Sequence, residues 1–352
     1  MKVVDLRSDT FTKPNPEMWE MIKSLDNSHI GDDVFGEDPS VNELEAKAAR
    51  IIGKEAAVYV TSGTQGNLIS LLAHTNRGEE IVIEEQCHIY QNELSSATKI
   101  AGLKVNLYSS NRGAPSIDEL QEIVEKNGDK EHPTTLLCSE STHNYHGGAI
   151  VKPQVLRDMK QFAENNGLKL HLDGARVFNA AVGLGVPVTE ITKHVDSVMF
   201  CLSKGLSCPV GSLVAGPKSF ISEARKYRKM VGGGMRQAGV IASFGLIALE
   251  PKWIQRLDED HKNAKMLAKG IESFNLSIKI LRPDTNILII SVPEGIRIGK
   301  VVRTLGNEGI MAFNIDKHRI RFVTHYGINE DDIQYSIDKI GKVLKKVLKK
   351  VL

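Results

Sequence analysis

The chain has 352 residues, of which 41% are hydrophobic and 25% are charged. Its 45 Lys and Arg residues against 43 Asp and Glu residues give a net charge of +2, which gives no reason to expect a nucleic-acid partner. The length is sufficient for a large core divided between two domains, and no run approaches the roughly 18 apolar residues of a membrane span.

Cysteine usage indicates a reducing compartment. The four cysteines (Cys87, Cys138, Cys201 and Cys208) show no C-x-x-C spacing and lie in or beside apolar runs. Buried thiols explain this pattern better than disulfides or zinc ligands. The first residues, 1–7, also lack the apolar stretch of a secretory signal. We therefore expect a cytoplasmic protein.

Apolar runs of strand length recur along the first two thirds of the chain. They lie at residues 57–60, 81–84, 104–108, 135–138, 168–172, 197–202 and 212–215. Helical patterns fall between many of them: one begins at a capping box over Ser40 to Glu43 and stops at Gly53, and another stops at Gly167. This alternation predicts an α/β domain with a mostly parallel sheet, whose ligand sits at the carboxyl ends of the strands.

The pattern changes after about residue 245. A charged helical segment at 252–273, strands near 286–292 and 319–324 and a final helix predict a smaller α+β domain. The expected organisation is an N-terminal arm (1–15), a large domain (16–245) and a small C-terminal domain (246–352). The last helix, 339–352, is amphipathic with lysines opposite its apolar face, which suits either a membrane surface or packing on the small domain. We favour packing, because nothing else in the chain supports membrane binding.

Two predicted strands run directly into ionisable residues, Asp173 and Lys204. Taken alone, Asp173 is equally an N-cap and Lys204 a lysine that reaches solvent. The turn from Ser62 to Asn67 leaves backbone N–H groups free to cradle a phosphate, although a plain tight turn has the same composition. All three features fall at strand ends of one predicted sheet. Together they indicate a pyridoxal phosphate site, with a lysine nucleophile and an acid beside a cationic ring nitrogen.

Three further side chains are candidates for binding. Arg176 either binds a substrate carboxylate or pairs with a nearby acid. Arg321 shares one strand face with Arg319, and it either grips a carboxylate bidentately or faces solvent on an edge strand. His88 either stacks on a flat cofactor or is a structural histidine.

Two other motifs are weaker. Glu140, His143 and His146 form an E-x-x-H-x-x-H run, but it falls in a Gly-rich loop rather than on a helix, so we predict no metal site. The segment 232–237 either starts a helix or brings Arg236 to a phosphate, in the second case from another subunit.

The chain resembles the low-specificity L-threonine aldolases, which belong to the fold-type-I, aspartate-aminotransferase-like group of pyridoxal phosphate enzymes. The resemblance implies a three-layer α/β/α large domain with a mostly parallel sheet and a smaller C-terminal domain. The matching motifs are residues 5–10 (DLRSDT), 31–39 (GDDVFGEDP), 62–64 (SGT), 88–90 (HIY), 142–144 (THN), 171–179, 201–212, 229–239 and 321–325 (RFVTH).

The resemblance also implies a role for each site residue. Lys204 would hold pyridoxal 5′-phosphate as a Schiff base, Asp173 would pair with the pyridine nitrogen, and His88 would stack on the ring. The implied cofactor residues are Ser62, Gly63, Thr64, His88, Asp173, Arg176, Ser203, Lys204 and Arg236. The substrate carboxylate would be held by Ser8, Arg176 and Arg321. Members of the family are homotetramers with sites at dimer interfaces, where Arg236 would reach a neighbour's phosphate.

The implied reaction is cleavage of L-threonine or L-allo-threonine to glycine and acetaldehyde, a step of threonine catabolism and glycine formation. His132, or His88 acting through water, is the expected base for the β-hydroxyl. The chain departs from the family pattern at Phe35, where tyrosine is usual, at Ser139 and Ser141, and at His132, which is shifted by one position. Another pyridoxal phosphate reaction, such as β-elimination or racemisation, and a catalytically silent fold are the alternatives.

Overall fold

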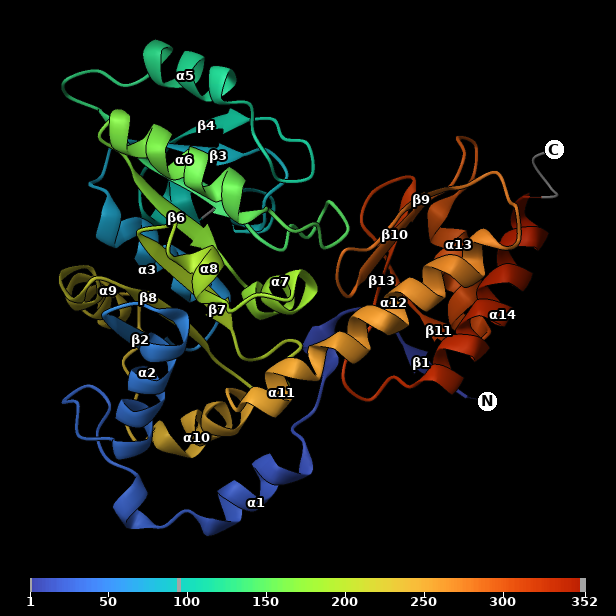
Figure 1. The fold of residues 1–352 in the computed structure, drawn as a ribbon, viewed down its shortest axis with the longest axis horizontal. Coiled ribbons are helices and arrows are strands. Elements are labelled where there is room, and N and C mark those ends of the chain that lie inside the picture. Colours follow the sequence, from blue (N-terminus) through green and yellow to red (C-terminus); the bar gives the residue numbers. More distant parts are fainter. Residues whose placement is uncertain (1, 94–95, 349–352) are drawn as a thin grey trace.

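The computed structural model describes residues 2–93 and 96–348, and these residues form two separate hydrophobic cores. Figure 1 shows the two parts side by side, with α11 (Pro251–Gln255) and α12 (Leu257–Glu272) running from one to the other. The larger part contains the predicted sheet. The smaller part contains most of the chain after residue 257, and the amino-terminal strand lies with it.

The central sheet of the larger part has seven strands, and all seven were predicted at these positions. Only β8 runs against the others, because β2 and β7 each pair with it in antiparallel fashion. The mostly parallel α/β sheet is therefore confirmed. In sheet order the strands are β2 (Ala56–Val60), β8 (Ser212–Gly216), β7 (Ser197–Cys201), β6 (Lys169–Asp173), β5 (Thr134–Glu140), β3 (Glu80–Glu84) and β4 (Lys104–Tyr108).

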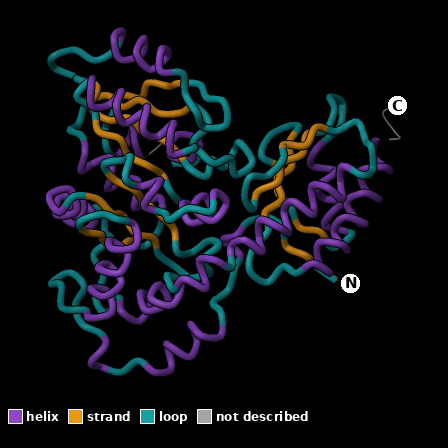
Figure 2. The backbone as a smooth tube through the Cα atoms, in the orientation of Figure 1, coloured by secondary structure: helices purple, strands orange, loops and turns teal. Residues whose placement is uncertain are grey.

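Helices bury both faces of this sheet. Successive residues of a strand point to opposite faces, so Ala57 and Tyr59 enter one core whereas Val58 and Val60 enter another. Figure 2 shows the strands between the helices. The first face packs against α1 (Pro16–Ser24), α2 (Pro39–Ile52), α6 (Pro153–Asn165), α7 (Val177–Leu184), α8 (Thr189–Thr192) and α10 (Gly239–Ala248). The second face packs against α3 (Gly63–His74) and α9 (Lys218–Met230), and the short α4 (His88–Gln91) lies beside it. A further helix, α5 (Ile117–Lys126), contributes Leu120 to the first core.

The smaller part is an antiparallel sheet covered by helices. Its strands lie in the order β12 (Phe313–Asn314), β13 (Arg319–Val323), β10 (Ile287–Ser291) and β9 (Lys279–Leu281). The helices α12, α13 (Ile298–Asn307) and α14 (Glu330–Leu348) share its core. The predicted boundaries at residues 15 and 245 stay predictions.

The amino-terminal strand joins this smaller part. β1 (Val4–Asp5) pairs in parallel with β11 (Ile310–Met311), and Leu6 is fully buried in the second core. Beyond Leu6, residues 8–12 run to the site described below. The expected N-terminal arm is therefore anchored to the smaller part through Val4, Asp5 and Leu6, and Ser8 and Thr10 line the cavity described below.

Two predicted helix features differ in detail, and a third agrees. The cap of α2 is Asp38, which accepts from the Val41 N–H at 3.1 Å, and not Ser40, because Pro39 occupies the first helical position. The segment predicted at 252–273 is two helices separated at Arg256. The terminal helix packs Ile340, Val343, Leu344 and Leu348 into the second core, which favours the packing interpretation; Val351 and Leu352 lie outside the described residues.

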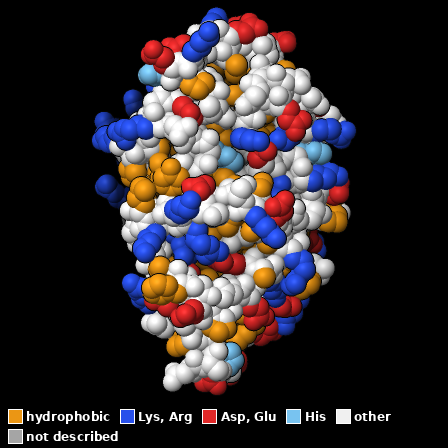
Figure 3. Space-filling view, turned by 90° about the vertical axis from the view of Figure 1, so that its left-hand side faces the viewer, with side chains coloured by type: hydrophobic (Ala, Val, Ile, Leu, Met, Phe, Trp, Pro, Cys, Tyr) orange, Lys and Arg blue, Asp and Glu red, His pale blue; other side chains and the backbone are white. Residues whose placement is uncertain are grey.

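Charge and thiol placement agree with the composition. On the face in Figure 3, Lys and Arg side chains alternate with Asp and Glu side chains rather than forming one basic surface. All four cysteines are buried and free. Within residues 2–93 and 96–348, no helix combines the length and the apolar character needed to cross a membrane.

Candidate active site

The predicted site residues follow strands whose carboxyl ends meet at one edge of the sheet. Ser62 follows β2, Asp173 ends β6, and Lys204 follows β7 by three residues. Because β2, β6 and β7 run in the same direction, their ends lie at the same edge. The loop that carries Lys204 is held in place: the Lys204 carbonyl accepts from Thr12 Oγ1 at 2.8 Å and from the Ser207 N–H at 2.9 Å.

A cavity of about 310 Å³ opens at this edge and contains five of the predicted residues. They come from the amino-terminal segment, the loops after β3, β6 and β7, and strand β13. The cavity is thus built from both parts of the molecule. Its lining residues are Ser8, Thr10, His88, Asn92, Asn144, Tyr145, Arg176, Lys204, Phe313, Asn314, Ile315 and Arg321.

Asp173 is 2% exposed and lies close to His88. Asn67 Nδ2 donates to one carboxylate oxygen at 2.9 Å, and the Ala175 N–H donates to the other at 3.1 Å. Ligand atoms of Asp173, His88 and Glu93 lie within 4.8 Å of one another. A buried carboxylate whose oxygens accept hydrogen bonds from neutral donors is suited to pair with a cationic ring nitrogen.

His88 is bound through one of its two ring nitrogens. Nδ1 lies 2.5 Å from Glu93 Oε1, so Nε2 is the nitrogen left for the cavity. Burial lowers the pKa of His88, but the hydrogen bond with Glu93 and the charge of Asp173 outweigh it, and the net pKa is raised. His88 therefore carries a proton more readily than an ordinary histidine.

The predicted phosphate turn is the first turn of α3 rather than a loop before it. Ser62 caps the helix by accepting from the Gln65 N–H at 3.1 Å, which leaves the first backbone N–H groups without intrahelical partners. Gly63 packs tightly on β7, since a Cβ there would lie 2.9 Å from Cys201 Sγ. The glycine thus lets a positive helix end sit against the strand that leads to Lys204.

Arg176 pairs with a nearby acid, which is one of the two roles expected for it. Its Nε and Nη2 atoms donate to the Asp9 carboxylate at 2.7 and 2.8 Å, and both residues are buried. Although burial would raise the pKa of Asp9, the guanidinium lowers it well below its usual range. The Asp9 carboxylate therefore balances the charge of Arg176, and Nη1 is the guanidinium nitrogen that takes no part in this ion pair.

Arg321 has no such acid among the described residues. Its Nη1 donates to Asn144 Oδ1 at 2.7 Å and its Nη2 to the Arg7 carbonyl at 3.3 Å, while Nε is buried without a partner. Burial, and secondarily the charge of Arg176, lower its pKa to about 10. The cavity thus holds a guanidinium that lacks a counter-ion, which favours an anionic ligand.

Seven predicted residues do not line this cavity, among them Ser62, Gly63 and Asp173, which are described above. Ser203 adjoins Lys204, with its N–H bonded to the Gly211 carbonyl at 3.3 Å. Thr64 is exposed on the first turn of α3. Arg236 is 64% exposed and pairs with Asp32 at 2.8 Å.

His132 is one of the two residues expected as the base. It precedes β5, whose seven residues span about 20 Å at roughly 3.3 Å per residue, so it lies at the opposite edge of the sheet. Within one chain His132 does not line the cavity, and its role as the base stays a prediction. His88 is the histidine that remains in the cavity.

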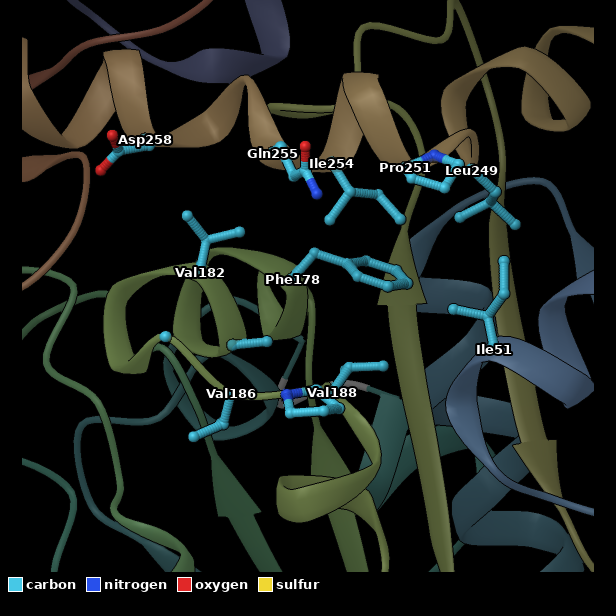
Figure 4. A pocket seen from close by; sticks show the side chains of 13 residues that line it. Ile51, Phe178, Val182, Val186, Val188, Leu249, Pro251, Ile254, Gln255 and Asp258 are labelled. Carbon is cyan, nitrogen blue, oxygen red and sulfur yellow. The ribbon is translucent and has the colours of Figure 1, made fainter.

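The larger cavity, of about 760 Å³, lies elsewhere and has a different character. Figure 4 shows Phe178 and Val182 of α7 facing Ile254, with Gln255 and Asp258 as its labelled polar side chains. It contains none of the residues predicted for the site. We therefore place the chemistry in the smaller cavity, which has the convergent charged groups.

Several side chains that the sequence did not single out complete the site. Asp9, Asn67, Glu93 and Asn144 each bond a predicted residue, across sequence separations of 167, 106, 5 and 177 positions. Only Glu93 was near enough to its partner to be found by spacing. Asp9 and Asn144 lie within motifs that carried the resemblance, which was the available signal.

The comparisons with known proteins agree with this geometry. The family model for beta-eliminating lyases matches residues 5–294. "Probable low-specificity L-threonine aldolase 2" of Arabidopsis thaliana is 39% identical over 350 residues, covering 97% of this chain and 98% of the relative. A solved Leishmania major threonine aldolase has a TM-score of 0.83 at 18% identity, covering 97% of this chain and 99% of that one. A structure of SPT with PLP has a TM-score of 0.77 at 15% identity, covering 98% and 88%.

The fold and the matched model thus define a lyase of the beta-eliminating type. Within that class, the chain belongs to the low-specificity L-threonine aldolase family.

Proposed function

We propose that this chain cleaves L-threonine and L-allo-threonine to glycine and acetaldehyde with pyridoxal 5′-phosphate as cofactor. One observation carries the proposal: Lys204 shares a cavity with Arg321, a guanidinium without an acidic partner among the described residues. An amine nucleophile beside an unpaired cation suits an amino acid, whose carboxylate would occupy the cation.

The residues at the strand edge fit the cofactor. Lys204 would hold it covalently, Asp173 would keep a proton on its ring nitrogen, and Ser62, Gly63 and Thr64 would bind its phosphate at the start of α3. The fit rests on a buried carboxylate bonded by neutral donors, and on a helix end packed too closely on β7 for a side chain at Gly63. When bound, the cofactor accepts the electron pair released as the Cα–Cβ bond breaks.

The chain's own residues would orient the substrate and move its protons. Arg321 and the free Nη1 of Arg176, with Ser8 beside them, would hold the carboxylate and so fix the Cα–Cβ bond relative to the ring. His88 would receive the β-hydroxyl proton at Nε2, directly or through a water, while Glu93 holds Nδ1. A proton would then be delivered to Cα, which completes the glycine product.

We further propose a cytoplasmic homotetramer with sites at dimer interfaces. Exposed apolar side chains accompany Arg236: Phe35 is 75% exposed, Met230 73% and Val240 43%. A second subunit covering them would bury this surface and bring Arg236 to its neighbour's phosphate. His132 would take part in catalysis only if a neighbouring subunit supplied it.

Product analysis tests the activity. The purified, cofactor-loaded protein should be incubated with L-threonine, L-allo-threonine and their D-enantiomers in parallel. Acetaldehyde and glycine in equal amounts from the L-forms are the expected result. Ammonia and a keto acid would instead indicate β-elimination, and a protein that stays colourless with cofactor would indicate a silent fold.

A further inference from the structure

A second group of ligating side chains converges outside the cavity described above. Glu84 ends β3, whereas His143 and His146 lie in the loop that follows β5. One ligand atom from each lies within 4.8 Å of the others. The sequence pattern had suggested Glu140 as their companion. Glu140 instead accepts from the backbone N–H groups of His88 and Asn144, so the acid in this cluster comes from the neighbouring strand.

The spacing of these atoms matches the edges of a metal coordination sphere. His143 Nε2 lies 2.9 Å from Glu84 Oε2, and His146 Nε2 lies 3.5 Å from Glu84 Oε1. Four ligands at about 2.0–2.1 Å from a tetrahedral centre are separated by about 3.3 Å. The two observed separations lie on either side of that value, so small side-chain adjustments would admit an ion.

The cluster is buried and supported as a metal site requires. Glu84 is 1% exposed and His143 fully buried, whereas His146 at 16% gives a route from solvent. The Gln86 N–H at 2.6 Å and Ser110 Oγ at 3.0 Å hold the carboxylate in place. Such outer contacts orient ligands in metal sites. Both imidazoles are directed at this one carboxylate, and their ring centroids lie 4.4 Å apart.

We propose that Glu84, His143 and His146 bind a divalent transition-metal ion of the zinc type, with water at the fourth position beside Ser110. Two imidazoles and one carboxylate form a donor set that zinc and cobalt accept, whereas calcium and magnesium prefer oxygen ligands alone.

The location gives the ion a way to affect the substrate pocket. The loop that carries both histidines also carries Asn144, whose Oδ1 accepts from Arg321 Nη1 at 2.7 Å. An ion that fixes this loop to β3 would also fix the acceptor that orients Arg321. The effect on the substrate pocket rests on the proposed function, whereas ion binding itself does not.

Cobalt binding to the full-length, pyridoxal phosphate-loaded protein tests the site. After chelator treatment, Co²⁺ should be titrated in and followed by its visible absorption, and Zn²⁺ should then displace it. The loaded protein is used because the cofactor would occupy the other compact group, His88, Glu93 and Asp173. We expect one Co²⁺ per chain, with an absorption typical of four-coordinate geometry.

Variants decide the assignment. His146→Ala should weaken Co²⁺ binding by about tenfold or more, while its melting temperature and cofactor absorption stay unchanged because the side chain is near the surface. His29→Ala is the matched control, since His29 is an exposed histidine paired with an acid, Asp26, at 2.8 Å. Unchanged Co²⁺ binding in His146→Ala, or no stoichiometric binding by the parent protein, would overturn the proposal, whether or not the protein cleaves threonine.

Discussion

The two cavities described above differ in size and in chemistry, and the smaller one carries the proposed activity. The cavity at the strand ends has about 310 Å³ and holds a lysine, two arginines and a histidine. The other has about 760 Å³ and is lined mainly by aliphatic side chains of α7 and α11. Reactivity thus depends on charged groups that converge from distant segments, and volume alone does not indicate it.

The largest expected effect is that of removing the amine. Lys204→Ala should lower aldol cleavage by at least about 10³-fold, because no other lysine lines the cavity. Acetaldehyde formation and the loss of borohydride-reducible cofactor are the measurements. Lys252→Ala, an exposed lysine paired with Glu17, is the control. Substantial turnover by Lys204→Ala would contradict the assignment of this cavity.

Removing the unpaired guanidinium should have the next largest effect. Arg321→Ala leaves the substrate carboxylate with Arg176 Nη1 as its remaining charged donor in the cavity, and we expect kcat/KM to fall by about 30-fold, equivalent to about 2 kcal/mol. The cofactor should stay bound, as its absorption would show. Arg319→Ala is the control on the same strand face, since Arg319 is paired with Asp316. Cofactor loss in Arg321→Ala would mean that Arg321 has a different role.

A third prediction concerns pH. Glu93 raises the pKa of His88, and only neutral His88 can accept a proton. Activity should therefore fall as pH drops through this raised pKa. Glu93→Gln removes the charge that favours the imidazolium, so the acid limb of the kcat/KM profile should move to lower pH. Glu122→Gln, at a carboxylate of α5 that is 70% exposed, should leave the profile in place. An unmoved acid limb in Glu93→Gln would exclude His88 as the titrating group.

The smallest effect is expected in the larger cavity. Val182→Ala should lower the free energy of unfolding by about 1 kcal/mol, because it removes two methyl groups from a partly buried site. Acetaldehyde formation should stay unchanged. Thermal melting and initial rates measure the two quantities. A marked loss of activity in this variant would show that the apolar cavity is needed for catalysis. The two cavities would then not differ in function.

Local patterns predicted the parts of the site that lie beside their own strands. Asp173, Lys204 and the turn at Gly63 were found because each follows an apolar run, and the direction of the strands then brings them together. The same reasoning placed all seven strands of the main sheet. Such features depend on a few neighbouring residues, so one sequence is enough to identify them.

The partnerships between distant residues were not predictable in this way. Nothing near Arg176 indicates that Asp9 neutralises it, whereas Arg321, in a similar context, has no acid. His132 was expected from the resemblance to the family, but the direction of β5 places it at the edge of the sheet opposite the cavity. The start of α2 shows the same limit on a smaller scale. The capping-box pattern favours Ser40, whereas Pro39 at the first helical position makes Asp38 the cap.

The pairing of β1 with β11 also constrains when the protein can become active. Ser8 and Asp9 reach the cavity only because Val4 and Asp5 are held by Ile310 and Met311. During synthesis Ser8 and Asp9 must therefore wait for Ile310 and Met311, which are made much later. The strands around Lys204 precede this point in the chain, but the pocket for the substrate is completed only after residues 310–321 have been made. A nascent chain would thus bind cofactor before it could act on an amino acid.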